Sequence, residues 1–379
     1  KYSITAMTFS CFAYCIIAAD KYGTPISDII YGMDMRSGKY LDIFRALMTD
    51  EEYSSATGCM PNLLQVPAKI LWLQNTLSQK PEKFLTLQQF ILSNLGLEPL
   101  SDYSCIAQGI LNLKTGILSP KIMEVIGTNK KMFGDVVESA TIVGNITHFG
   151  RVQLPNSMCV VLGAHDAVCG GLGLGIWPKG RKDIMGNCAG TADLLCLFSD
   201  EFKNVWPKYP ELCATAGVVK GSNCYHIGVA SGVILDWFVR EFGGTDVSEA
   251  LKRMGNHLSS KVRTLVDEKT LSTSFYNLSI STKFDELLNS LMETLAFIIK
   301  HLRELTDVSG QKAKKVRIGA SGARSDYQVQ LKADIIGIPV ERVKNLEVSS
   351  VGAAIIASVA TGIYDDYAQA IEQMVRVER

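Results

Sequence analysis

The sequence predicts an α/β fold divided into two domains, and three observations carry this prediction. The chain has 379 residues, which is long for one hydrophobic core. Residues 315–360 read as strand, helix, strand and helix with tight glycine-rich connections, a pattern typical of α/β architecture. Pro155 and Asn156 interrupt the apolar pattern near residues 153–157. We therefore expect one domain over residues 1–155 and a second over residues 156–379.

The first domain mixes strand-like and helical stretches. Residues 4–10 and 15–19 are apolar and are expected to form strands on either side of a bend. Residues 66–77 predict a helix with Pro67 at its start, where the missing N–H costs nothing. Residues 83–95 predict another helix, which ends near Gly96.

The second domain is more regular. Residues 158–163 form an apolar stretch typical of a strand, and further strands are expected within residues 184–196 and 225–229. Residues 231–242 predict a helix. Residues 284–305 carry apolar side chains at helical spacing and predict a long core helix.

The composition excludes several classes of function. Lys plus Arg and Asp plus Glu each total 38, so the formal net charge is zero. Nucleic-acid and anionic-membrane surfaces need concentrated positive charge, so we expect neither partner. The ten cysteines contain no CxxC pair and the five histidines are scattered, which argues against a zinc site and for a reducing cytoplasm. The apolar stretch 4–19 is short for a spanning helix.

Asp166 is the first candidate for chemistry. It follows the strand-like residues 158–163 and begins a glycine-rich segment, GAHDAVCGGLGLG. A carboxylate at a helix start, beside unpaired N–H groups, could accept the proton of an alcohol that attacks a phosphate. On spacing alone, an ordinary helix cap is the commoner explanation. The glycines do not fit GxGxxG, so a Rossmann dinucleotide site is not supported.

Two further segments are compatible with phosphate or nucleotide binding. Gly190 and Thr191 lie between two apolar strands, where their N–H groups and hydroxyl could contact phosphate, although an ordinary hairpin explains them as well. Residues 318–326, IGASGARSD, lie between a strand and a helix and leave room for a flat ring against the backbone. Tight strand-to-helix packing is the equal alternative.

The order and spacing of these segments resemble the FGGY carbohydrate kinases, a branch of the actin-like ATPase superfamily. Weaker matches precede them: Asp34 and Arg36 resemble a W-x-D-x-R region, residues 69–73 an A-K-L-L-W-L helix, and residues 102–104 a D-Y-S segment. The block from residue 319 to residue 364 extends the resemblance. It covers nearly the whole chain.

The resemblance implies two ribonuclease-H-like domains around a central cleft, with ATP and Mg²⁺ in the cleft and closure that excludes water. Asp166 matches the catalytic base. The positions that match nucleotide-contacting residues are Gly190, Thr191, Gly232, Asp236, Gly322 and Ala323, with Asp326 nearby. The positions that fall in the family's sugar pocket are Ala13, Tyr14, Asp34 and Arg36, with Asp166. Ligands for the metal are not assigned.

The chain also departs from the family pattern. The family opens with a D-x-G-T-type hairpin that contacts phosphates, and Lys1 follows that point. We expect that hairpin to lie outside these residues rather than to be lost from an inactive member, because Asp166 and residues 319–326 are intact; without it, turnover of ATP should be poor. Phe12-Ala13-Tyr14 stands where xylulose kinases carry Gln-Met-His. Gluconate, another ketopentose or a tetritol are therefore candidates beside xylulose.

The resulting prediction is a cytoplasmic carbohydrate kinase of the xylulose or gluconate type. It would transfer a phosphoryl group from ATP to a hydroxyl of a small sugar, sugar acid or polyol. The alternative is a catalytically inactive sugar- or nucleotide-binding protein on the same fold, and a third option is an actin-like ATPase without a sugar substrate. We expect no nucleic-acid or membrane partner, and the sequence leaves a homodimer open.

Overall fold

The computed structural model describes residues 4–180, 182–254, 261–267, 270–306 and 312–378, which fold into two compact units. Unit 1 comprises residues 1–180, 198–225 and 349–374, and unit 2 comprises residues 181–197, 226–348 and 375–379. The expected boundary at residues 153–157 lies inside strand β10 (Val152–Val161). The compact units are therefore assembled from several segments of the chain and do not meet at the expected boundary. The division into family domains over 1–155 and 156–379 remains a prediction.

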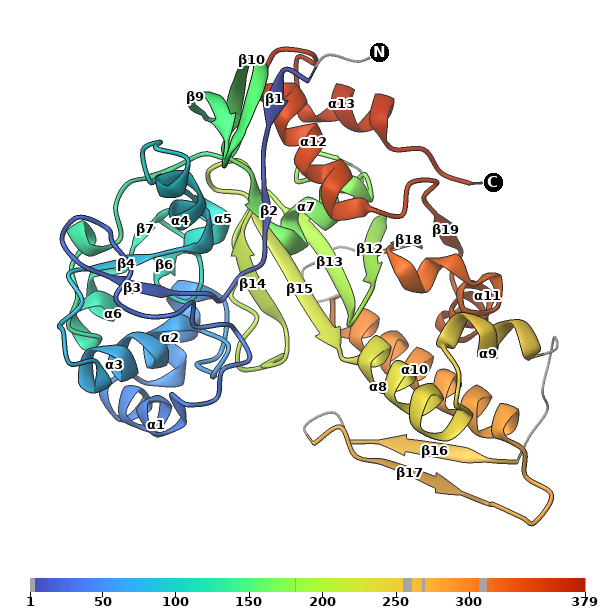
Figure 1. The fold of residues 1–379 in the computed structure, drawn as a ribbon. Coiled ribbons are helices and arrows are strands. Elements are labelled where there is room, and N and C mark those ends of the chain that lie inside the picture. Colours follow the sequence, from blue (N-terminus) through green and yellow to red (C-terminus); the bar gives the residue numbers. More distant parts are fainter. Residues whose placement is uncertain (1–3, 181, 255–260, 268–269, 307–311, 379) are drawn as a thin grey trace. The chain divides into compact units, whose positions relative to one another are not determined.

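The strands of unit 1 are mostly short (Figure 1). They are β1 (Ala6–Met7), β2 (Ser10–Cys11), β3 (Ile17–Ala19), β4 (Lys83–Leu85), β5 (Ser101–Asp102), β6 (Leu111–Asn112), β7 (Ile117–Leu118), β8 (Val136–Val137), β9 (Ile142–Phe149), β10, β11 (Ala164–His165) and β14 (Cys213–Ala216). Strand β10 pairs parallel with β1 and antiparallel with β9, and β11 pairs parallel with β2. The expected strands over 4–10, 15–19 and 158–163 are therefore present, with shorter or shifted bounds.

The helices of unit 1 follow local capping signals. They are α1 (Gly38–Leu47), α2 (Asp50–Thr57), α3 (Val66–Thr76), α4 (Leu87–Asn94), α5 (Tyr103–Ile106), α6 (Pro120–Val125), the 3₁₀ turn η1 (Lys130–Met132), α7 (Asp166–Gly173), α12 (Val348–Ala360, which begins at the last residue of unit 2) and α13 (Tyr367–Met374). The helix expected over 66–77 is confirmed, with Pro67 in its first turn. In Figure 1, α1 and α3 lie against each other.

The helix expected over residues 83–95 is wrong at its start. Lys83–Leu85 forms β4, which pairs antiparallel with β3 through Ile17 and Leu85. The helix begins only at Leu87, because Thr86 and Gln89 cap it reciprocally through side chain and backbone. A distant strand therefore overrides the local helical pattern.

Unit 2 is built on a sheet covered by helices. Its strands are β12 (Ile184–Ala189), β13 (Asp193–Ser199), β15 (Asn223–Val229), β18 (Lys315–Gly319) and β19 (Val340–Arg342), with a separate hairpin of β16 (Arg263–Val266) and β17 (Thr273–Tyr276). The strands of this sheet that lie wholly or partly in unit 2 follow one another in the order β15-β13-β12-β18-β19. Strands β12, β18 and β19 are parallel, and β13 is antiparallel to β12. The strand–helix alternation expected near residues 315–360 is confirmed.

The helices of unit 2 carry a large apolar cluster. They are α8 (Ser231–Phe238), the π-helical turn η2 (Val239–Gly243), α9 (Val247–Arg253), α10 (Phe284–Thr306), the 3₁₀ turn η4 (Ser321–Arg324) and α11 (Asp326–Ile336). Leu288, Leu291 and Leu295 of α10 pack against Ile234 and Phe238 of α8. The long core helix expected over 284–305 is thus confirmed. No helix in the described ranges has the length and apolar character needed to cross a bilayer.

Candidate functional site

Asp166 is the first residue of α7, directly after β11. His165 is the N-cap, and its Nδ1 accepts the N–H of Ala167 at 3.0 Å. The carboxylate of Asp166 accepts the same N–H at 2.7 Å and its side chain remains 49% exposed. Asp166 is therefore not the N-cap that spacing favoured. Its carboxylate can meet a ligand.

A buried hydrogen-bonded chain holds the start of α7. The carboxylate of Asp102 caps α5, and its Oδ2 accepts the hydroxyls of Ser104 and Ser139 at 2.5 and 2.9 Å. The Ser104 hydroxyl in turn accepts the N–H of His165 at 2.8 Å. Asp102 and Ser104 are fully buried. The D-Y-S segment thus fixes the backbone that carries Asp166, a role the sequence did not reveal.

Tyr14 lies beside this helix start in unit 1. Its ring packs edge-on against the ring of His165, with centroids 6.0 Å apart. Burial, followed by the nearby Cys59 thiol, raises the pKa of the Tyr14 phenol well above its usual range. The backbone of Tyr14 has a φ of 62°, which is rare for a bulky residue and typical of a functional site. The adjacent Ala13 is buried, and its carbonyl accepts the thiol of Cys15.

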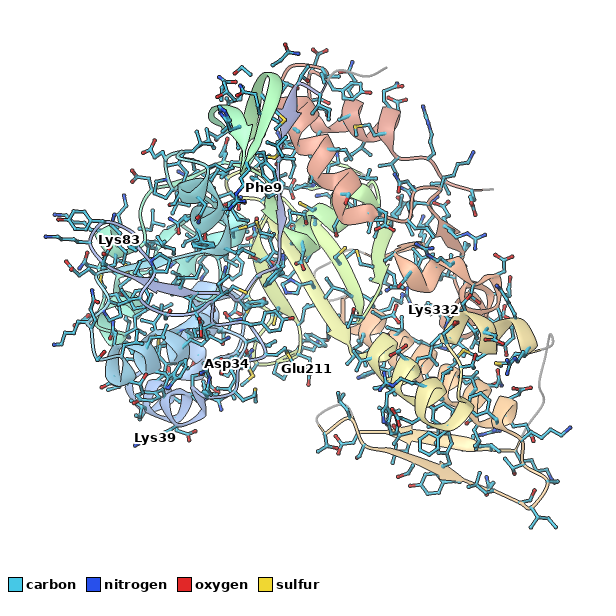
Figure 2. The ribbon with its side chains drawn as sticks, viewed as in Figure 1. Phe9, Asp34, Lys39, Lys83, Glu211 and Lys332 are labelled. Carbon is cyan, nitrogen blue, oxygen red and sulfur yellow. The ribbon has the colours of Figure 1, made fainter. Side chains whose placement is uncertain are left out.

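Asp34 and Arg36 form an ion pair in the loop before α1, and Asp34 is labelled in Figure 2. Arg36 donates through Nε and Nη2 to both oxygens of Asp34, at 3.0 and 2.5 Å. Its guanidinium also lies 4.6 Å from the ring centroid of Trp72 on α3. The hydrogen bond from Arg36 holds the pKa of Asp34 below its usual value. This pair is therefore a fixed, charged surface rather than two mobile side chains.

Lys69 of α3 donates a hydrogen bond to the backbone of the same loop. Its buried ammonium donates to the carbonyl oxygens of Gly32, Leu63 and Leu64 at 3.0, 2.8 and 2.7 Å. Burial lowers the pKa of Lys69 to about 8. All three N–H donors are used, so Lys69 ties the backbone before Asp34 to α3.

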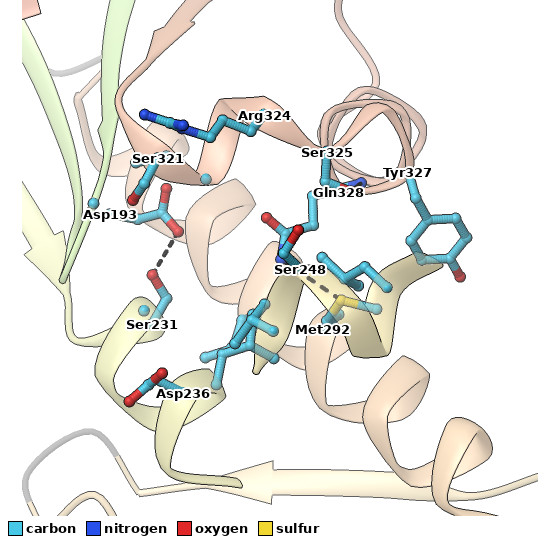
Figure 3. A pocket seen from close by; sticks show the side chains of 18 of the residues that line it. Asp193, Ser231, Asp236, Ser248, Met292, Ser321, Arg324, Ser325, Tyr327 and Gln328 are labelled. Carbon is cyan, nitrogen blue, oxygen red and sulfur yellow. Dashed lines mark hydrogen bonds between the residues drawn. The ribbon is translucent and has the colours of Figure 1, made fainter. Parts of the chain in front are cut away.

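A cavity of about 790 Å³ lies within unit 2 (Figure 3). The β12–β13 turn, the start of α8, η4 and α11 supply its polar wall, and α9 and α10 contribute apolar side chains. Its volume is in the range that small-molecule sites have. The polar and backbone groups that line it include Gly190, Thr191, Asp193, Ser231, Gly232, Asp236, Ser321, Gly322, Asp326 and Lys332, and further charged side chains there are Arg240, Lys252 and Arg324.

The structure brings six of the seven expected nucleotide-contacting residues to this cavity. Asp236 and Asp326 are exposed there and pair with Arg240 and Arg342 at 3.1 and 2.7 Å. Ala323 is the exception, because it is fully buried in a cluster with Ala189 and Ile318. Its carbonyl accepts a hydrogen bond from Arg342. Ala323 thus packs η4 onto the sheet instead of lining the cavity.

Close backbone approaches shape the polar wall. A Cβ on Gly232 would lie 2.1 Å from the carbonyl oxygen of Gly190, and one on Gly322 would lie 2.9 Å from that of Ala189. The N–H of Val233 donates to the carbonyl of Thr191 at 3.0 Å. Only glycine fits at Gly232, so the turn after β12 and the start of α8 form one continuous backbone surface.

This surface fits a nucleotide. Backbone N–H groups at the turn and at the start of α8 suit anionic oxygens, and the hydroxyl of Thr191 adds a donor. The apolar side chains that could cover a flat base are Trp237, Leu251, Met292, Leu295 and Leu331. Over the described ranges, no three His, Cys, Asp or Glu side chains cluster as metal ligands. A Mg²⁺ ion commonly binds through phosphates and water with only one or two carboxylates, so this arrangement is compatible with it.

Two charged residues of the cavity were missed by the sequence. Asp193 follows the Gly190–Thr191 turn, and Lys332 lies on α11 (Figure 2). They pair at 2.5 Å although both are nearly buried. A lone Asp after a turn and a lone Lys in a helix carry no local signal, so only the packed structure reveals the pair.

Family models match most of the chain. The N-terminal domain of the FGGY family of carbohydrate kinases matches residues 1–173, and the C-terminal domain of the same family matches residues 255–361. The two matches follow each other in the family's order. They include Asp166 and the segment around Gly322.

Curated relatives agree with the family models. A gluconokinase from Bacillus licheniformis is 23% identical over 398 residues, which span 95% of this chain and 75% of the relative. An autoinducer-2 kinase from Yersinia enterocolitica is 25% identical over 401 residues, which span 96% of this chain and 74% of the relative.

Solved structures confirm the fold. A xylulose kinase from Lactobacillus acidophilus matches with a TM-score of 0.87 and 17% identity, over 100% of this chain and 80% of that one. A glycerol kinase from Plasmodium falciparum, solved with ADP, matches with a TM-score of 0.84 and 18% identity, over 100% and 79%. The expected α/β fold of the actin-like ATPase type is therefore confirmed. The chain belongs to the FGGY family of carbohydrate kinases, phosphotransferases with an alcohol group as acceptor.

Proposed function

We propose that the chain transfers the γ-phosphoryl group of ATP to a hydroxyl of a small sugar, sugar acid or polyol, of the xylulose or gluconate type. The observation that carries this proposal is the half-exposed carboxylate of Asp166 at the start of α7. Matches to a gluconokinase and a xylulose kinase support the substrate type.

Asp166 is the general base in this proposal. Phosphoryl transfer needs an acceptor hydroxyl held in line and relieved of its proton, and an exposed carboxylate suits that task. The Asp102–Ser104 chain keeps the backbone of α7 in place through the N–H of His165. Asp166 can therefore accept a proton without reorganising its helix.

The sugar contacts are assigned to Ala13, Tyr14, Asp34 and Arg36. Tyr14 lies against His165, next to the base, and its phenol stays protonated because its pKa is raised. It can donate to or accept from a sugar hydroxyl. The Asp34–Arg36 pair supplies both acceptors and donors, which suits a polyhydroxy ligand or a sugar acid.

The nucleotide contacts are assigned to Gly190, Thr191, Gly232, Asp236, Gly322 and Asp326. The first three form the backbone surface described above, and the buried Ala323 packs η4 without contacting the nucleotide. Bound Mg²⁺ would neutralise phosphate charge. The backbone surface of the turn and of α8 orients the phosphates.

The remaining assignments follow from the family and stay predictions. Residues 1–155 are proposed to bind the sugar and residues 156–379 the nucleotide. A cytoplasmic location, a homodimer and the lack of nucleic-acid and membrane partners are proposed with them. None of the comparisons favours a non-catalytic protein.

A substrate panel tests the proposal. ADP release is measured with the full-length protein over xylulose, gluconate, other ketopentoses, tetritols and glycerol. We expect turnover that depends on one of these substrates. Asp166→Asn should lower kcat by about 10²- to 10⁴-fold, because it removes the base, while the dissociation constant for ADP stays unchanged.

Asp42→Asn is the matched control, since Asp42 is an exposed carboxylate on α1 of the same unit. It should behave as the wild type. ADP binding without turnover on any substrate would contradict the proposal, and so would an Asp166→Asn variant that keeps full activity.

A further inference from the structure

Four buried polar side chains meet at the base of the unit 2 cavity. They come from four elements: Asn187 from β12, Asp193 from β13, Ser231 from α8 and Lys332 from α11. Three of them, Asp193, Ser231 and Lys332, also line the cavity. We name these four residues the Asp193 cluster.

Both carboxylate oxygens of Asp193 accept hydrogen bonds from other members of the cluster. Oδ1 of Asp193 accepts from Nζ of Lys332 at 2.5 Å and from Nδ2 of Asn187 at 2.9 Å. Oδ2 accepts from the hydroxyl of Ser231 at 2.5 Å, the bond drawn in Figure 3. Lys332 also donates to Oδ1 of Asn187 at 3.2 Å. The carboxylate thus joins α11, β12 and α8.

A contribution to the stability of the fold does not by itself explain why these charged residues are buried. A buried ion pair often contributes no more than apolar residues of the same volume, because both charges lose their hydration. A buried charged network does fix geometry, because each member accepts few alternative positions. The part of the molecule that the Asp193 cluster holds in place therefore indicates what the cluster is for.

The cluster adjoins the backbone surface that fits phosphates. Asp193 is the first residue of β13, directly after the turn of Gly190 and Thr191. Ser231 is the first residue of α8 and precedes Gly232. The turn and the helix are also joined directly, through the N–H of Val233 and the carbonyl of Thr191. Loss of Asp193 would remove the bond to Ser231 at the start of α8, and loss of Lys332 would leave the buried carboxylate of Asp193 without its cation.

We propose that the Asp193–Lys332 pair is a positioning device for the nucleotide. It holds the Gly190–Thr191 turn and the first turn of α8 at the spacing that receives the phosphates, with Ser231 and Asn187 fixing its orientation. This inference rests on the proposed function of the cavity. It assigns no direct part in phosphoryl transfer to either residue.

The test compares Lys332→Met and Asp193→Asn with the wild type in the full-length protein. We measure KM for ATP, KM for the sugar, kcat, and the dissociation constant for ADP by calorimetry. KM for ATP and the ADP dissociation constant should rise about tenfold to a hundredfold, because the phosphate contacts are misplaced. KM for the sugar should stay within about threefold of the wild type, since nothing is removed from the sugar contacts.

Lys315→Met is the matched control. Lys315 pairs with Glu341 between β18 and β19, and neither residue lines the cavity. Its loss should leave ADP binding unchanged. Lys332→Arg, which keeps the charge, should restore part of the lost affinity.

The outcomes separate the two proposals. If the wild type binds ADP and folded Lys332→Met binds it equally well, the pair has only a structural role and the inference fails while the kinase proposal stands. If the wild type binds no ADP, the proposed function fails first. If Lys332→Met does not fold, Ser231→Ala decides, because it removes one bond without stranding a charge. Weaker ADP binding by Ser231→Ala supports the inference, and unchanged binding overturns it.

Discussion

The two units build their candidate sites in different ways. In unit 1 the assigned groups are side chains, and each is held by its neighbours: Asp166 by the start of α7, Tyr14 by His165, Arg36 by Asp34 and Trp72. In unit 2 the assigned groups include much backbone, and its segments approach one another closely because Gly232 and Gly322 carry no Cβ. Removing atoms should therefore damage the first site, and adding atoms should damage the second.

Two buried lysines show the reverse arrangement, with backbone partners in unit 1 and side-chain partners in unit 2. Lys69 in unit 1 is held by three backbone carbonyls, and burial lowers its pKa to about 8. Lys332 in unit 2 is held by a carboxylate and an amide. Lys69 holds its loop through carbonyl oxygens, and burial without a directly bonded anion lowers its pKa. Lys332 instead forms an ion pair with the carboxylate of Asp193.

Among the further substitutions that test this contrast, the largest effect is expected where atoms are added in unit 2. Gly232→Ala places a Cβ 2.1 Å from the carbonyl oxygen of Gly190, so the turn and α8 must separate. KM for ATP should rise by at least about tenfold, and the protein should lose about 1–3 kcal/mol of stability. Steady-state kinetics and thermal unfolding measure the two effects.

Gly190→Ala provides the comparison for stability. A Cβ at Gly190 meets no atom within 4 Å, so the unfolding temperature should not change. A Gly232→Ala protein with wild-type stability and wild-type KM for ATP would show that backbone approach does not shape this site.

A moderate effect is expected where a side chain is altered in unit 1. Arg36→Lys loses the two-pronged contact to Asp34 and the stacking on Trp72, because an ammonium is not a planar fork. KM for the sugar should rise several-fold, to about tenfold, while KM for ATP stays unchanged. Initial rates at varied sugar concentration provide the measurement.

Arg45→Lys is the matched control, since Arg45 pairs with Asp50 through Nε and Nη2 at 3.1 and 3.0 Å in the same unit. It should leave both KM values unchanged. Equal effects of the two substitutions on sugar binding would remove Arg36 from the sugar contacts.

The smallest effect is a pH dependence from Lys69. Its pKa is about 8 when folded and ordinarily 10.5, so above about pH 8 the unfolded chain binds more protons at this group. Stability contributed by Lys69 therefore rises as pH increases from about 8 towards 10.5. The slope is at most about 1.4 kcal/mol per pH unit. Lys69→Met should flatten it and should also destabilise the protein, because three carbonyls lose their donor.

Chemical denaturation between about pH 8 and 9.5 tests this slope as the difference between the wild type and Lys69→Met, because buried thiols with raised pKa values, such as Cys169, give the same opposing slope in both proteins. Lys39→Met is the control, since Lys39 is an exposed lysine on α1. If Lys69→Met shows the same pH slope of stability as the wild type, the assignment of the slope to Lys69 is contradicted.

Local patterns in the sequence predicted much of the fold. The helical spacing of Leu288, Leu291 and Leu295 predicted α10, and Pro67 marked the start of α3 correctly. β4 was missed because its pairing with β3 depends on residues more than sixty positions away. The helix after Ser231 was expected to reach Phe242, but regular α-helix ends at Phe238 and a π-helical turn follows.

The candidate site was only partly visible in the sequence. Its glycines were found because small residues between a strand and a helix are a local feature. Ala323 was assigned to the cavity by resemblance, whereas packing buries it. Asp193 and Lys332 are 139 positions apart, so their pairing depends on the sheet and not on any motif. Residues whose role depends on a partner that is distant in the sequence cannot be found by searching for local motifs.

Gly352 shows how the end of the chain completes its beginning. A Cβ on Gly352 of α12 would lie 1.8 Å from the carbonyl oxygen of Cys169 on α7, and both residues belong to unit 1. The helix that carries the proposed base therefore rests on a helix almost two hundred positions later. Cutting the gene between the two family segments would not yield two self-sufficient halves: the upstream product would lack the cover of α7, and α12 would be stranded on the downstream product.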